Sequence, residues 1–314
     1  MWSYTNLYRD QGTRSRGGEG AELCDLLVIF GDHIILFSDK SCEWPADVTV
    51  DVAWSRWCKR AIVKSAGQVW GAERWLREHP KRVFLNRSCL EPVPLPLPTG
   101  SAVRFHRVVV AHDESGQRRK LAGGSGSLMI DMRIAGGAHL LPPSKGGYPF
   151  AVGHLDPKRG YVHVLDDVSL DIVMSAADTV TDFVEYLGAK EDCLERGLVV
   201  GALGEEDLLA YYLTHYNEEG RRTFAQLEAG RGSVVVGGHW KDLSSRPEYL
   251  NKRRADRVSY NWDRIIEDVT EHAIGGTLHF TNDPSIQAQE RILRVMAAES
   301  RLRRRVLAKG LGEV

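Results

Sequence analysis

The apolar positions near the N-terminus fall into two short runs, residues 23–30 and 33–37, separated by Gly-Asp at 31–32. Two such runs around a two-residue turn of this composition are typical of a tight β-hairpin. A two-residue turn also sets the register of the two strands, because it places Phe30 opposite His33. The sequence therefore predicts a hairpin whose body is apolar and whose open end is polar.

This register indicates which polar side chains share a face of the hairpin. Asp25 is expected opposite Ser38. Since side chains alternate between the two faces of a strand, Asp25, Ser38 and Lys40 point to one side and Asp39 to the other. One interpretation is a site for metal-assisted phosphodiester hydrolysis, because Mg²⁺ takes carboxylate ligands and a lysine stabilises developing charge. The alternative is a surface hairpin whose ends are polar because they leave the core.

A helical pattern over residues 52–78 follows, and Pro80 ends it. One stripe at helical spacing is aromatic or small, and it is expected to face the core. Its members are Trp57, Ala61, Ser65, Gln68, Ala72 and Trp75. Because Ser65 and Gln68 lie in the middle of this stripe, they need polar partners. The polar face of the hairpin is the natural candidate.

The same helix carries four indoles and a run of cations. The indoles are Trp54, Trp57, Trp70 and Trp75, and the cations include Lys59, Arg60 and Lys64. Packing is the favoured interpretation for the tryptophans, with stacking on nucleic-acid bases as the alternative. The cations suit either a phosphate backbone or a solvated helix face.

Further along, strands and then helices are expected. The predicted strands are residues 83–85, 103–112, 127–132, 149–154, 161–166 and 233–236, with a polar, glycine-rich loop over 113–126. The predicted helices are residues 175–195, 205–217, 255–273 and 285–309. This order predicts an α/β fold over residues 1–170, a mixed sheet with a long packing helix, followed by a mainly α-helical region over 171–314.

The composition changes this picture little. The chain has 314 residues, 43% of them hydrophobic and 26% charged, with a formal net charge of -1. These values are ordinary for a soluble globular protein, so any basic surface must be local. Arg14 and Arg16, in a glycine-rich loop, are one such group. No apolar run approaches the roughly 20 residues needed to span a bilayer, and the N-terminus lacks a signal-peptide core, so a cytoplasmic protein without membrane contact is expected.

Metal-binding motifs built on cysteine are absent from the sequence. The five cysteines include no CxxC pair, which disfavours a cysteine zinc site. Histidines are more numerous, at eleven. His106 and His112 lie six residues apart on a predicted strand and share a face, but chance pairings among so many histidines are common. A histidine metal site is therefore not favoured by the sequence.

The segment from Glu22 to Lys40 resembles the centre of PD-(D/E)xK nucleases, which include restriction endonucleases and Mrr-like and nuclease-related domains. In these proteins a first acid lies on one strand, an acidic-x-Lys triplet on the next, and a helix with a glutamine often follows. By position, Asp25 matches the first acid, Lys40 the lysine and Gln68 the glutamine. Glu22 resembles the glutamate that often precedes the first acid. The helix and the strands after it also fit the family's α/β order.

The chain departs from this pattern at one position. The second acid of the family is expected at residue 38, where this chain has Ser38. Three outcomes follow. Glu22 or Asp39 completes the metal site, the enzyme works with fewer carboxylates, or the site has lost catalysis and only binds.

The resemblance implies a nuclease that cleaves DNA or RNA with Mg²⁺ or Mn²⁺. Metal would be held by Asp25 with Glu22 or Asp39, and catalysis would use Asp25, Lys40 and Gln68. Substrate contacts are expected from Ser38, Ser65, Lys64, Arg14 and Arg16. The helical half would bind substrate or a partner protein, and a role in bacterial phage defence is an extension of the resemblance. The competing hypothesis is a catalytically inactive nuclease-fold module that binds nucleic acid or a partner protein.

Overall fold

The computed structural model describes residues 2–12, 19–196, 200–224, 234–278, 283 and 285–312. Within these residues the chain is a mixed α/β protein with two mixed sheets. Arg14 and Arg16, expected to contact substrate, lie outside the described residues.

The larger sheet has six strands in the order β4-β1-β2-β3-β5-β8. They are β4 (Val83–Phe84), β1 (Trp2–Arg9), β2 (Ala21–Phe30), β3 (His33–Ser41), β5 (Arg104–His112) and β8 (Val162–Asp166). Pairing is antiparallel from β4 to β3 and parallel from β3 to β8. The carboxyl ends of β3, β5 and β8 therefore meet at one edge of the sheet.

The smaller sheet has four strands in the order β10-β9-β6-β7. They are β10 (Val234–Val236), β9 (Val200–Ala202), β6 (Met129–Ala135) and β7 (Ala151–His154). The predicted strands over 127–132, 149–154, 161–166 and 233–236 are confirmed to within a few residues.

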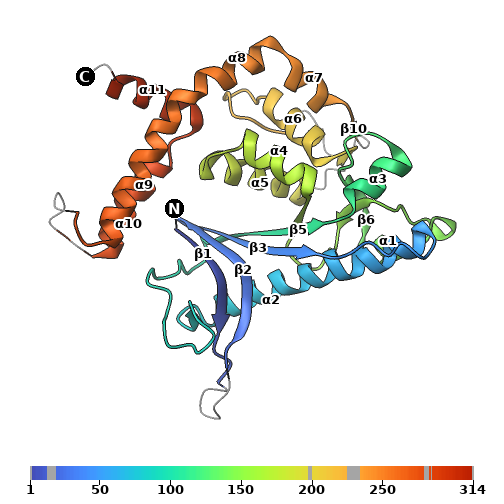
Figure 1. Ribbon diagram of the computed structural model, residues 1–314, viewed down its shortest axis with the longest axis horizontal. Coiled ribbons are helices and arrows are strands. Elements are labelled where there is room, and N and C mark those ends of the chain that lie inside the picture. The colour runs from blue at the N-terminus through green and yellow to red at the C-terminus, as the bar shows by residue number, and fades with distance from the viewer. Residues whose placement is uncertain are drawn as a thin grey trace.

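One face of the larger sheet is covered by a continuous helical stretch (Figure 1), which confirms the helix predicted over 52–78. It consists of α1 (Val50–Cys58), the π-helical segment η2 (Lys59–Val63) and α2 (Lys64–Glu78), and it ends before Pro80. Trp54 and Trp57 are fully buried. Their indole N–H groups donate to backbone carbonyls, which confirms packing as their role.

The opposite face is covered by α4 (Asp167–Ala176), α5 (Val180–Glu195) and α6 (Glu205–Thr214), as Figure 1 shows. The core on this side combines residues from both halves of the chain, such as Ile35 and Phe37 with Phe183. Residue 170 lies inside α4 and not in a linker.

The remaining helices are short or lie towards the C-terminus. They are α3 (Ser115–Ala122), η3 (Gly136–Leu140), η4 (Pro143–Lys145), α7 (His239–Ser245), α8 (Pro247–Ala255), η5 (Asp256–Ser259), α9 (Tyr260–Ile274), α10 (Ile286–Ala297) and α11 (Arg301–Gly312). In the part of the chain described, none of the helices is long and apolar enough to cross a membrane.

Several elements differ from the sequence predictions, including β9, α4, α7 and α8, which the sequence did not predict. β1 was not predicted, because only Trp2 and Leu7 of this strand are buried and the rest shows little apolar alternation. α3 occupies the predicted loop over 113–126, and Arg118 is its one residue with a buried side chain among those described. The helix predicted over 285–309 is divided into α10 and α11, and the buried guanidinium of Arg301 at the start of α11 forms ion pairs with Asp178 and Asp263.

Candidate functional site

The hairpin forms with the predicted register. Phe30 pairs with His33, and the ladder continues as far as Leu26 and Phe37. Beyond it, the carboxylate of Asp25 accepts a hydrogen bond from the backbone N–H of Asp39, with an O···N distance of 2.7 Å. Asp25 is therefore fixed by the neighbouring strand at the open end of the hairpin, although it is not part of the ladder.

An acid pair and a lysine meet at this open end. Burial raises the pKa of Glu22, and the hydrogen bond and negative charge of Asp25 raise it further, whereas the charge of Lys40 lowers it. The carboxyl group of Asp25 and the ammonium group of Lys40 are therefore both near enough to Glu22 to affect its ionisation. Glu22 and Lys40 remain exposed, so a ligand has access to them from solvent.

The long helix supplies the glutamine. The hydroxyl of Ser38 donates to Oε1 of Gln68, with an O···O distance of 3.1 Å. Ser38 is only 1% exposed and shares the α2 side of β3 with the core residues Ile34 and Leu36. Strand alternation places Lys40 on that side as well. We call Glu22, Asp25, Ser38, Lys40 and Gln68 the hairpin site.

Three other predicted residues do not join this group. The carboxylate of Asp39 points to the α4 side of the sheet and lies 2.7 Å from Nε2 of His112, so it is not beside Asp25. Ser65 is fully buried, and its hydroxyl has no hydrogen-bond partner among the described residues. Lys64 is exposed on the helix surface.

Asp39 instead belongs to a polar chain at the carboxyl edge of the parallel strands. His112, at the end of β5, contacts Asp39 through one ring nitrogen and Asp167 through the other. Burial lowers the pKa of His112, but the hydrogen bonds to Asp167 and Asp39 raise it more, so the net shift is upward. Both carboxylates therefore favour the protonated form of this imidazole.

Two buried acids lie next to this chain. Burial and the charge of Asp166 raise the pKa of Glu114 to about 9. Burial raises the pKa of Asp166 to about 6, although its carboxylate accepts hydrogen bonds from the backbone of Ser169 and Leu128. Glu114 is not among the residues that the sequence analysis singled out. A signal for both acids was present in the sequence, since Asp166 ends β8 and Glu114 lies two residues after β5. Ligands of parallel α/β sheets collect at these carboxyl ends of strands.

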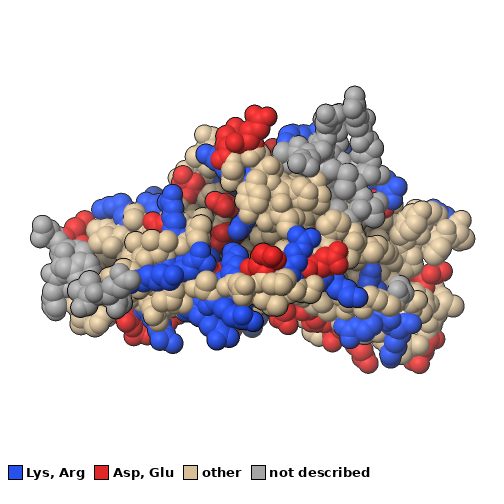
Figure 2. Space-filling view, turned by 90° about the horizontal axis from the view of Figure 1, so that it is seen from above, with Lys and Arg blue, Asp and Glu red and all other residues tan. Residues whose placement is uncertain are grey.

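The surface charge agrees with a near-neutral chain. On the face in Figure 2, lysine and arginine are interspersed with aspartate and glutamate. Several cations line a cleft of about 830 Å³ between α5 and the start of α11. Arg104, Arg222 and Arg301 line this cleft, together with Asp182 and Glu185.

A comparison of the chain with protein families, with curated proteins and with solved structures found no match. The assignment of a function therefore depends on the side chains of this chain and on their arrangement. The hairpin site is the strongest basis for one, because it joins residues from two strands and a helix in a chemically coherent group.

Proposed function

We propose that the chain is a nuclease-like protein that uses a divalent metal ion to hydrolyse phosphodiester bonds of DNA or RNA at the hairpin site. The observation that carries this proposal is the acid pair of Glu22 and Asp25 beside Lys40. Carboxylates at one end of the site and a lysine within reach are what phosphodiester hydrolysis requires, because the metal and the lysine both stabilise negative charge on the phosphate.

The order of elements supports the proposal. The antiparallel pair β2–β3 is followed by α1 and α2 and then by β5, which is parallel to β3. This is the strand-helix-strand order expected of a restriction endonuclease-like core. The glutamine of α2 lies against β3 through the contact between Gln68 and Ser38.

The site suits Mg²⁺ or Mn²⁺. Both ions prefer oxygen ligands, and besides burial the negative charge of Asp25 raises the pKa of Glu22. A divalent cation held between them would remove that repulsion. When bound, the ion supplies Lewis-acid activation of the phosphate or of a water molecule.

The remaining side chains have separate roles in this proposal. Lys40 holds a non-bridging phosphate oxygen or orients the attacking water. Gln68 is a positioning residue that holds Ser38 and the end of β3 in place. The helical half of the chain binds the nucleic acid or a partner protein, in keeping with a role in phage defence.

A binding module without catalysis is the second candidate, and Ser38 favours it. This serine stands at the position of the second acid, is buried, and uses its hydroxyl to contact Gln68. Asp39 cannot replace the missing acid, because its carboxylate is engaged by His112. The remaining carboxylates are those of Glu22 and Asp25, and a site with only two supports either weaker catalysis or binding alone.

A cleavage assay separates the two candidates. The full chain is incubated with Mg²⁺ or Mn²⁺ and with plasmid DNA, linear DNA or RNA. Catalysis at the hairpin site predicts metal-dependent cleavage that falls by about 10²-fold or more in Asp25→Asn and in Lys40→Ala, a loss typical of removing one charge-stabilising group.

Matched controls come from the turn of the hairpin and from the residues that follow α2. Asp32→Asn changes an exposed acid at the turn, and Lys81→Ala changes an exposed lysine after α2. Both are expected to cleave as the wild type does. Binding of a nucleic acid without cleavage would support the second candidate, and cleavage that survives both Asp25→Asn and Lys40→Ala would exclude the hairpin site.

A further inference from the structure

A second group of ligand-type side chains lies on the other face of the sheet. His106 of β5 and His163 of β8 are fully buried, and Glu191 of α5 lies over them. One ligand atom of each residue lies within 4.8 Å of the other two. The parallel pairing of β5 with β8 brings the histidines together, because it places His163 opposite Val108, two residues from His106.

The distances suit a single metal ion. Oε1 of Glu191 lies 3.1 Å from Nδ1 of His106 and 3.0 Å from Nε2 of His163. Tetrahedral zinc has bonds of about 2.0–2.2 Å to nitrogen and oxygen, which puts neighbouring ligand atoms roughly 3.3–3.6 Å apart. The distance from Glu191 to each imidazole nitrogen would therefore have to lengthen by a few tenths of an ångström.

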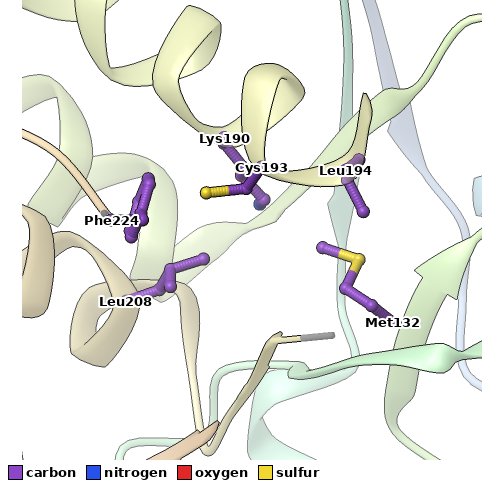
Figure 3. A pocket seen from close by; sticks show the side chains of 6 residues that line it. All are labelled: Met132, Lys190, Cys193, Leu194, Leu208 and Phe224. Carbon is purple, nitrogen blue, oxygen red and sulfur yellow. The ribbon is translucent and has the colours of Figure 1, made fainter. Parts of the chain in front are cut away.

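The charge of Glu191 has no lysine or arginine partner among the described residues. Figure 3 shows Lys190, its neighbour on α5, beside an apolar cavity lined by Cys193, Phe224 and others, and the ammonium group lies 2.6 Å from Glu205. That cavity leaves about 10 Å³, roughly the space of one water, so it is no ligand site itself. A buried carboxylate needs a compensating charge, which a cation beside two imidazoles provides.

Surrounding groups orient the ligands and separate them from a nearby cleft. Nδ1 of His33 lies 2.9 Å from Nε2 of His106, so the other nitrogen of His106 faces Glu191. Partners of this kind fix the orientation of metal-binding histidines. His33 also lines the cleft of about 830 Å³, together with Gly188 and Asp192 of α5, which places the cluster directly behind the cleft wall.

We propose that His106, His163 and Glu191 bind one divalent first-row transition-metal ion of the zinc class. Two imidazoles and one carboxylate match three-ligand zinc sites, which keep a fourth position open for water or a substrate. Mg²⁺ is excluded because it selects oxygen ligands. This site is separate from the hairpin site and does not depend on the proposed nuclease activity.

The competing arrangement is a hydrogen-bonded network without an ion. In it, both histidines donate to Glu191 and His33 donates to His106. Nδ1 of His163 is buried with no hydrogen-bond partner among the described residues in either arrangement, so it does not distinguish them. The two arrangements differ in whether the protein retains a stoichiometric metal ion.

Zinc titration of the chelator-stripped full chain, in competition with a chromophoric chelator, tests the proposal. One zinc ion is expected to bind the wild type, and Glu191→Gln is expected to bind it at least about 100-fold more weakly. Loss of a group that only supports a ligand weakens metal binding by about 10- to 100-fold, and loss of a direct carboxylate ligand should weaken it more. Glutamine keeps an oxygen that accepts hydrogen bonds from the histidines, so the network without an ion would tolerate it. Circular dichroism checks that the variant is folded.

Two control variants identify the site. His112→Gln removes the imidazole between Asp39 and Asp167, and Asp32→Asn changes an exposed acid at the hairpin turn. Both are expected to retain the wild-type zinc affinity. Unchanged affinity in Glu191→Gln, or loss of binding in His112→Gln, would overturn the proposal.

X-ray absorption of the zinc-loaded wild type gives an answer that needs no variant. The expected first shell contains nitrogen and oxygen at about 2.0–2.2 Å with imidazole scattering. Sulfur at about 2.3 Å would assign the ion to cysteine and refute the site, as would a stripped protein that takes up no zinc.

Discussion

Replacing Glu114 by glutamine perturbs a carboxyl group that the fold buries at the carboxyl edge of the parallel strands. Its side chain is 0% exposed, and neither carboxylate oxygen has a hydrogen-bond partner in another described residue. Burial and the charge of Asp166 raise the pKa of Glu114 from 4.5 to about 9. The group is therefore protonated at neutral pH in the folded chain and ionised in the unfolded chain.

The sign and size of the effect follow from this difference. A carboxyl group whose pKa is raised on folding lowers the free energy of unfolding progressively as the pH rises from the unfolded pKa to the folded pKa. A pH of about 7 lies roughly 2.5 units above the unfolded pKa, so the free energy of unfolding is lowered by about 3 kcal/mol. At about pH 5 it is lowered by under about 1 kcal/mol. Glutamine is neutral in both states and removes this cost.

Urea unfolding of the wild type and of Glu114→Gln at about pH 5, 7 and 8.5 measures this effect of Glu114 on the free energy of unfolding. The variant is expected to be more stable by about 3 kcal/mol at pH 7, by more at pH 8.5 and by little at pH 5. Glu78→Gln, an exposed change on α2, is the control and should follow the wild type. Parallel pH profiles for the wild type and Glu114→Gln would show that Glu114 is ionised in the folded protein and refute the reasoning.

Two further predictions concern the polar groups of β3 and β5. Ser38→Asp supplies the second acid at a buried position, so it should lower the stability of the fold. It should also raise the affinity for Mg²⁺ or Mn²⁺ and the rate of cleavage. A folded variant with unchanged metal affinity would contradict the role of position 38. Nuclear magnetic resonance titration should give His112 a pKa above 6.5 because Asp167 and Asp39 outweigh its burial, and Asp167→Asn should lower that pKa. The stability that protonated His112 contributes is present at low pH and lost as the pH rises through its folded pKa. An unaltered His112 pKa in Asp167→Asn would exclude the pairing of His112 with Asp167.

Local patterns in the sequence predicted the parts of the fold that depend on neighbouring residues. The two-residue turn fixed the pairing of Phe30 with His33, and helical spacing placed Gln68 on the side of the helix that faces β3. The contact between Gln68 and Ser38 follows from these two periodicities together. The chemistry assigned to the hairpin site stays a prediction.

Longer-range groupings could not be predicted, because they depend on which strands pair. His106 and His163 are 57 positions apart in the sequence and meet only through the parallel pairing of β5 with β8. Glu191 belongs to a helix with several acidic residues, and nothing in that pattern distinguishes it from a solvated side chain. The sequence instead grouped His106 with His112, which turns towards Asp39 and Asp167.

Cleavage of an end-labelled nucleic acid by the full chain in Mg²⁺ or Mn²⁺ tests the hairpin site most directly. The account predicts that cleavage requires the metal, falls by about 10²-fold or more in Lys40→Ala, and stays at the wild-type level in Lys81→Ala. Equal cleavage by the wild type and Lys40→Ala, with or without metal, would contradict it.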